Sequence, residues 1–283
     1  MSTASRSAGP QRIVSLLPAT TEVVVALGLA DRLVGRSFEC IGPAEVMAAP
    51  VVTVDLIAHA ATSQDIDAAV RSAAENGEGT SRVDIELLEQ LAPDIILTQD
   101  LCDVCAVPAS ALTSLDVPLV RTHPHTLDEV ADMIVRVAEA LGVPERGVRV
   151  AADMRERIDR VRGRVTHLTP RRVVVAEWID PPFTAGHWIP EMVVAAGGIE
   201  LLGTAGGRSR ETTWDAVRAA GAELVVLAPC GLDAGRAHAE FAAIDQQLSC
   251  PVVAIDADRL TAAPGPSLAE GVERLAELLH GAS

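Results

Sequence analysis

Short apolar runs alternate along this chain with stretches in which apolar residues recur at helical spacing. The apolar runs predict strands at residues 12–16, 33–37, 51–54, 94–97, 117–120, 173–176, 224–227 and 252–255. Helical spacing, capping residues and terminating glycines predict helices at residues 18–28, 65–75, 83–91, 126–141, 144–165 and 267–279. Strands that alternate with helices are typical of parallel sheets wrapped by helices, so we expect an α/β fold.

One predicted helix, at residues 144–165, is longer than the others and would measure roughly 30 Å at 1.5 Å per residue. We therefore predict two α/β lobes with parallel central sheets, joined by one long rigid helix, with a ligand cleft between the lobes. The expected boundaries are a disordered tail at 1–10, an N-terminal lobe at 11–143, the linking helix at 144–165 and a C-terminal lobe at 166–283.

Residues 172–198 hold the strongest indication of a site. An apolar strand is followed at once by Glu177 and Trp178, and the loop after it carries Phe183, His187 and Trp188. The chain has only 3 Trp, 3 Phe and no Tyr, so this loop concentrates a scarce residue type. Ligands of open α/β sheets bind at the carboxyl ends of strands, so we expect the loop to line a pocket.

Other residues that follow predicted strands extend this hypothetical site. Phe38 would add to its apolar wall, while Ser15 and the turn after it would direct the amino end of a helix, which favours anions, toward the ligand. Glu39 and Glu177 follow apolar strands, where partial desolvation raises a carboxyl pKa and permits proton transfer; a simple capping role is the alternative. His123 and His125 have the spacing of a possible chelate, although loop histidines more often face solvent.

Four cysteines, Cys40, Cys102, Cys105 and Cys230, also follow predicted strands. One interpretation is ligation of a soft metal or an iron–sulfur cluster by their thiolates. The alternative is that each is a small buried apolar residue, which is the usual role of a free cysteine. Cys250, at the opposite end of a strand, is expected to be structural.

The composition argues against some classes of function. The formal net charge is -16 and the hydrophobic content is 49%, which indicates a substantial core and argues against binding nucleic acid or an anionic membrane surface. No apolar signal segment precedes the first strand and no apolar run is long enough to span a membrane. We therefore expect a cytoplasmic protein with reduced cysteines, and the absence of a leader argues against a permease partner.

Several sequence segments resemble one known family. They are RIVSLLPATTE at 12–22, LAPDII at 91–96 and PGP at 264–266, together with the long helix. Over nearly the whole chain these segments resemble the class III substrate-binding proteins of ABC importers, which include vitamin B12-binding proteins. The segments SFEC (37–40), TQDLCDVCAV (98–107), EWIDPPFTAGHWIPE (177–191) and APCG (228–231) resemble a soluble subgroup labelled cobalamin-binding. The resemblance implies the two-lobed fold and a corrinoid, iron chelate or haem as ligand.

The leading hypothesis is a soluble binding protein that holds a corrinoid such as cobalamin, or another metal-bearing ligand, near Trp178, Trp188 and the cysteine-bearing loops. The alternative is a cytoplasmic metalloenzyme whose metal or iron–sulfur cluster is held by the four cysteines, with Glu39, Glu177 or His187 transferring protons. A third hypothesis is a relative of the same fold that pairs with another protein and binds no ligand.

Overall fold

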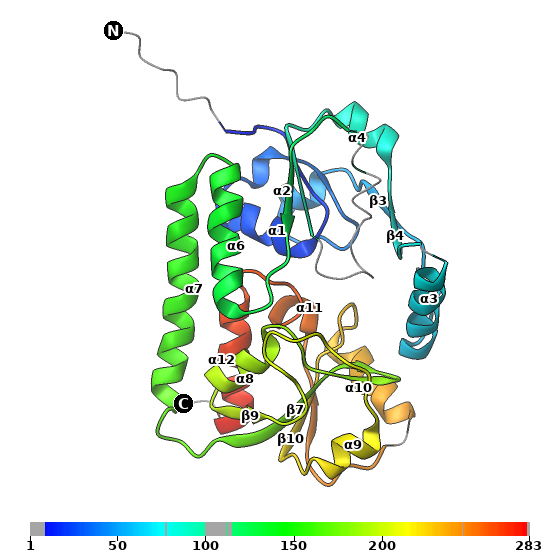
Figure 1. Ribbon diagram of the computed structural model, residues 1–283, viewed down its shortest axis with the longest axis vertical. Coiled ribbons are helices and arrows are strands. Elements are labelled where there is room, and N and C mark those ends of the chain that lie inside the picture. The colour runs from blue at the N-terminus through cyan, green and yellow to red at the C-terminus, as the bar shows by residue number, and fades with distance from the viewer. Residues whose placement is uncertain (1–8, 77, 100–111, 113–114, 245, 282–283) are drawn as a thin grey trace. The chain divides into compact units, whose positions relative to one another are not determined.

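The computed structural model describes residues 9–76, 78–99, 112, 115–244 and 246–281 (Figure 1). The chain forms two compact units. Unit 1 holds the residues up to Ala58, Ala73–His123 and Asp132–Ala151, and unit 2 holds His59–Ser72, Pro124–Ala131 and the residues from Ala152 onward. The chain thus changes unit five times, after residues 58, 72, 123, 131 and 151.

Unit 1 is built on a four-stranded parallel sheet with the strand order β2-β1-β5-β6. Its strands are β1 (Ile13–Ser15), β2 (Leu33–Arg36), β5 (Ile95–Gln99) and β6 (Leu119–Thr122). Around it lie α1 (Pro18–Ala26), η1 (Ala30–Arg32), α2 (Ala44–Ala48), α4 (Ile85–Leu91) and most of α6 (Leu127–Ala140). Apolar side chains of the strands and of α4 form the core, including Val14, Val52, Leu88 and Ile96.

Local sequence explains the helices of unit 1. Pro18 stands at the first turn of α1, where its missing N–H is no loss, and Gly28 follows the helix with a φ of 69°. Asp84 caps α4 by accepting a hydrogen bond from the Leu87 amide at 3.0 Å. These signals lie within a few residues of each helix end, so the sequence predicts both helices, although each observed helix is two residues shorter than expected.

Unit 2 contains a five-stranded sheet in the order β11-β10-β7-β8, with β9 also paired to β7. Its strands are β7 (Arg171–Ile179), β8 (Pro182–Thr184), β9 (Gly198–Glu200), β10 (Leu224–Leu227) and β11 (Val252–Ala254). β7, β9, β10 and β11 are parallel, whereas β8 returns antiparallel to β7. The helices are α8 (Ile189–Ala195), α9 (Trp214–Ala219), α10 (Ala234–Ala243), α11 (Ala257–Leu260) and α12 (Leu268–His280).

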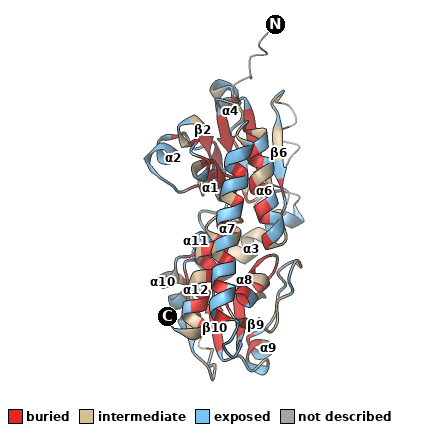
Figure 2. Cartoon of the chain, turned by 90° about the vertical axis from the view of Figure 1, so that its left-hand side faces the viewer, coloured by how far each residue is buried: buried red, intermediate tan, exposed pale blue. Residues whose placement is uncertain are grey.

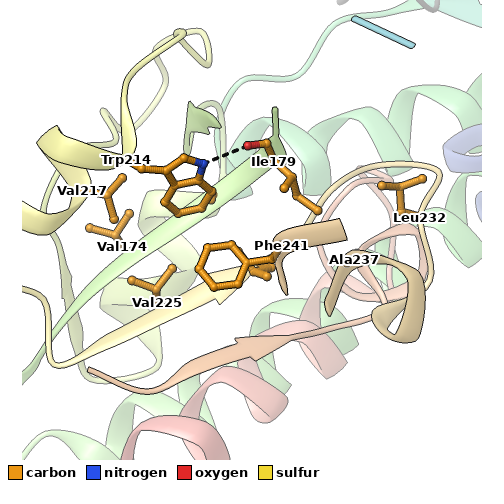
Figure 3. Close-up of a cluster of buried hydrophobic side chains, with 10 residues drawn as sticks. Val174, Ile179, Trp214, Val217, Val225, Leu232, Ala237 and Phe241 are labelled. Atoms are coloured by element: carbon orange, nitrogen blue, oxygen red, sulfur yellow. Dashed lines mark hydrogen bonds between the residues drawn. The ribbon is translucent and has the colours of Figure 1, made fainter. Parts of the chain in front are cut away.

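A cluster of buried side chains covers one face of this sheet (Figure 3). The Trp214 and Phe241 rings meet edge to face with centroids 4.9 Å apart, and Trp214 Nε1 donates to the Ile179 carbonyl at 3.1 Å. Val174, Val225 and Leu227 of the strands pack beneath them. The cluster therefore joins α9 and α10 to the sheet.

The long helix α7 (Pro144–Val165) has the bounds that the sequence predicts. Its first residues, through Ala151, belong to unit 1 and the rest belong to unit 2. The side of α7 that faces the viewer in Figure 2 is largely exposed, and the buried residues Ala151, Met154, Ile158 and Val161 recur at helical spacing. The predicted α/β class with parallel sheets and one long helix is confirmed. Across the described ranges, none of the helices combines the length and apolar content needed to cross a bilayer.

Two segments differ from the predicted pattern. The strand expected at 51–54 is β3 (Thr53–Asp55), and it pairs antiparallel with β4 (Ser81–Val83) in a separate ribbon. The helix expected at 83–91 begins two residues later, at Ile85, because β4 ends at Val83. Between β3 and β4 lies α3 (Ser63–Glu75), whose residues through Ser72 belong to unit 2.

Candidate functional site

The side chain of Glu177, near the end of β7, anchors the loop between β8 and α8. Its two carboxylate oxygens accept hydrogen bonds from the Gly186 amide, at 2.7 Å, and from the Ser209 hydroxyl. Gly186 fits so closely that a Cβ atom there would lie 2.3 Å from the Ser209 amide nitrogen. Glu177, which the sequence suggests as an acid–base group, therefore holds two loops of unit 2 together at the carboxyl end of the central strand.

His187 sits in this anchored loop in a left-handed conformation, with a φ of 51°. Its amide donates to the Gly207 carbonyl at 2.5 Å, and its carbonyl accepts from the Gly206 amide at 2.9 Å. These two bonds hold a backbone conformation that is uncommon for a residue with a side chain. The backbone that carries the imidazole is therefore held by the loop that contains Gly206 and Gly207.

The imidazole of His187 lies beside two other rings. Its centroid is 5.4 Å from that of His125 and 5.6 Å from that of Trp188. Within the described residues its Nε2 atom is buried and has no hydrogen-bond partner. Burial lowers the pKa of His187, and the charges of His125 and Arg208 lower it further. The shift favours the neutral form of the ring, whose Nε2 atom has no hydrogen-bond partner in the described part of the chain.

The aromatic residues of the predicted pocket have different surroundings. Trp188 is only 4% exposed and its Nε1 donates to the Thr261 carbonyl at 2.7 Å, so it belongs to the core of unit 2. Trp178 is half-buried, donates to the Ser63 carbonyl at 3.1 Å and stands opposite Phe183 in the β7–β8 pairing. Trp178 and Phe183 thus form an apolar patch at the end of β7.

The residues predicted in unit 1 lie at the ends of β1 and β2. Ser15 is fully buried, and its hydroxyl is hydrogen-bonded to those of Thr20 and Thr21, at 2.7 and 2.8 Å. This network fixes the start of α1. Phe38 is half-buried and its amide donates to Thr53 Oγ1 at 3.0 Å, while Glu39 is exposed.

Only two of the four predicted cysteine ligands, Cys40 and Cys230, lie in the described part of the chain, and they belong to different units. Cys102 and Cys105 lie outside the described residues. Cys40 is fully buried in unit 1, where Thr21 Oγ1 donates to its sulfur at 3.0 Å, and Cys230 is exposed in unit 2. Among the described residues there is no group of three or more His, Cys, Asp or Glu side chains placed to hold a metal ion. A site built from all four predicted cysteines stays a prediction.

We expect Cys40 and Cys230 to differ sharply in reactivity. Burial raises the pKa of Cys40 to about 11, so at pH 8 about one thiol in a thousand is ionised, and thiolate is the reactive form. Treatment with iodoacetamide followed by peptide mass spectrometry should find Cys230 alkylated and Cys40 unmodified in the native protein. Both should be labelled in denaturant. Equal labelling of the two in the native protein would contradict the buried environment of Cys40.

Unit 2 also contains a hollow away from these residues. It has a volume of about 840 Å³ and runs between the second half of α7 and the segment that holds α8 and β9. Its walls include Met154, Ile158, Val194 and Ile199, with Arg155 and Arg162 among the charged residues. None of the residues predicted from the sequence lines it. The site is therefore better defined by the loops at the carboxyl end of β7.

Structure also reveals pairings that the sequence analysis missed. His125 was considered with its neighbour His123, but its ring lies next to His187, 62 positions along the chain. Ser209 was not singled out as a site residue, although its hydroxyl donates a hydrogen bond to Glu177. No local spacing signals either pairing, because each depends on the packing of distant loops.

Comparison with known proteins supports a common ancestry. A profile of the family described as "Periplasmic binding protein" matches residues 13–246. The chain is 26% identical over 193 residues to the vitamin B12-binding protein of Yersinia pestis (strain Pestoides F), an alignment that covers 68% of this chain and 60% of that protein. The periplasmic vitamin B12-binding protein of Vibrio cholerae superposes with a TM-score of 0.65 at 24% identity, covering 95% of this chain and 96% of the other. A periplasmic haem-binding protein from Pseudomonas aeruginosa superposes with a TM-score of 0.75 at 19% identity, covering 97% and 94%.

Proposed function

Because the chain belongs to the periplasmic binding protein family, we propose that it binds a corrinoid or a haem-like tetrapyrrole for delivery to an ABC permease. The observation that carries the proposal is the anchored loop after β7, which presents an imidazole and an aromatic patch at the carboxyl end of a central parallel strand. The vitamin B12-binding and haem-binding proteins that resemble this chain support the choice of ligand class.

The cytoplasmic location expected from the sequence is wrong. The chain belongs to a family of periplasmic binding proteins, and solved relatives are described as periplasmic proteins, which work outside the cytoplasmic membrane. The expectation of reduced cysteines was based on a cytoplasmic location and no longer follows, because disulfides persist in oxidising compartments. The argument against a permease partner had the same basis and no longer follows either.

The metalloenzyme alternative has no comparable support. The raised pKa of Cys40 keeps that thiol protonated, which disfavours thiolate ligation. Glu177 is engaged with Gly186 and Ser209, in contacts that position a loop. The family profile and the superposed structures point to binding proteins.

Titration with cyanocobalamin and, separately, with haemin tests the proposed function. We expect one of the two to bind with a dissociation constant of about 1 μM or below, by calorimetry and by quenching of tryptophan fluorescence. The substitution Trp178→Ala should weaken binding about tenfold or more, because it removes the half-buried indole at the end of β7. Val194→Ala, on an exposed side chain of the α7–α8 hollow, is the matched control and should bind normally. The absence of binding by both ligands at about 100 μM would overturn the proposal.

A further inference from the structure

We propose that His125 and His187 of unit 2 together bind a divalent transition-metal ion, such as Zn²⁺, Co²⁺ or Ni²⁺. This inference does not depend on which organic ligand the protein carries. It rests on the separation of the two imidazoles, on the surroundings of His187 and on the way its loop is held.

The distance between the two rings fits a shared ion. Imidazole nitrogens bind zinc at about 2.0–2.1 Å, which places the ion about 3.2 Å from each ring centre. At a tetrahedral angle the two ring centres would then lie about 5.2 Å apart. The observed separation of the His125 and His187 centroids is 5.4 Å, and the ring planes are tilted by 32°. The separation of the two rings therefore matches the separation expected for two imidazoles that share one ion.

A buried nitrogen without a partner needs an explanation. His187 Nε2 is buried and makes no hydrogen bond among the described residues, whereas buried polar atoms in proteins nearly always have a partner. A bound ion would satisfy this atom.

Both histidines are held by contacts that fix their backbones. Hydrogen bonds to Gly206 and Gly207 hold His187 in its left-handed conformation, so the strain is localised at the residue that carries the free nitrogen. The His125 amide donates to the Glu129 carboxylate at 2.6 Å. Glu129 thereby positions His125 and contributes a negative charge that favours a cation nearby.

Two protein ligands leave coordination positions open. Within the described residues no third His, Cys, Asp or Glu completes a cluster, so water or donor atoms of an arriving ligand would take the remaining places. Open positions are typical of exchangeable metal sites, whereas structural zinc sites are closed by four protein ligands. The positive charge of Arg208, which lowers the pKa of His187, opposes a cation and limits the affinity.

Titration with Co²⁺ alone tests the proposal, because a tetrahedral imidazole site gives visible absorption bands. The background should carry Cys102→Ser, Cys105→Ser and Cys230→Ser, since thiolates also bind these metals. We expect saturable binding at one site, which His187→Asn and His125→Gln each weaken at least about tenfold. Asn tolerates the left-handed conformation better than most residues, so His187→Asn should preserve the fold.

Two further variants sharpen the result. His167→Ala removes an exposed histidine of unit 2 and should leave binding unchanged, whereas Arg208→Ala should strengthen it severalfold by removing an opposing charge. The proposal is overturned if no Co²⁺ binds at about 1 mM, or if His187→Asn, shown to be folded by circular dichroism, binds as tightly as the background protein.

Discussion

Replacing Gly271 by alanine should destabilise the protein by about 3 kcal/mol or more. Gly271 is buried in α12, and a Cβ atom there would lie 1.9 Å from the Leu260 carbonyl oxygen of α11 and 2.6 Å from Met192 Cε of α8. The methionine tail can move aside, but the carbonyl belongs to the backbone of α11, so one helix must shift. We expect a large fall in the urea midpoint, measured by far-ultraviolet circular dichroism.

The same substitution at Gly163 is the matched control. Gly163 also lies in a helix, α7, but nothing stands within 4 Å of the position that its Cβ would occupy. Gly163→Ala should raise the stability by about 0.5–1 kcal/mol, because alanine loses less backbone entropy in a helix. If the two variants unfolded at the same urea concentration, the close packing of α11 and α12 would be refuted.

Truncating Trp214 to alanine should cost about 3–5 kcal/mol. The side chain is 7% exposed, packs edge to face against Phe241 and donates a hydrogen bond to Ile179 (Figure 3). Trp214→Phe keeps an aromatic ring but leaves the Ile179 carbonyl without this donor, so it should cost less, about 1–3 kcal/mol. Chemical denaturation of the three proteins should therefore rank them in the order wild type, Trp214→Phe, Trp214→Ala.

A double-mutant cycle separates the ring contact from simple burial. Combining Trp214→Ala with Phe241→Leu should reveal a coupling of about 0.5–1.5 kcal/mol, the usual range for aromatic pairs. Purely additive losses would show that the two rings pack independently in spite of a centroid separation of 4.9 Å.

The elements that the sequence predicts correctly are those with local signals. β10 has the expected bounds, 224–227, because Glu223 precedes its apolar residues and Pro229 follows soon after them, and α7 has the expected bounds because Pro144 begins it. The ribbon of β3 and β4 was missed because its strands pair across a 25-residue gap that contains α3. Pro182 begins β8 at the edge of the sheet, where a proline is tolerated.

The candidate site was likewise predicted where the signal is local and missed where it depends on tertiary packing. Glu177 and His187 were selected because they follow an apolar strand, and the structure places them in one anchored loop system. The contact of His187 with His125 and the role of Ser209 could not be predicted from the sequence, because both depend on how loops far apart in the chain pack together. Trp188 was expected to line a pocket, but exposure cannot be judged from a residue's place in a loop, and its indole is buried.

The repeated passage of the chain between its two units constrains biosynthesis. Ser63 is translated early, yet its amide pairs with Glu240, 177 residues later, and its carbonyl pairs with Trp178. The segment around Ser63 therefore cannot form its native contacts until nearly the whole polypeptide has been synthesised. Until then the apolar side chain of Ile66 stays exposed to solvent. No single cleavage point yields two fragments that each contain one complete unit. If the two halves of the chain were expressed separately, at least one fragment would therefore lack segments of the unit that it should form.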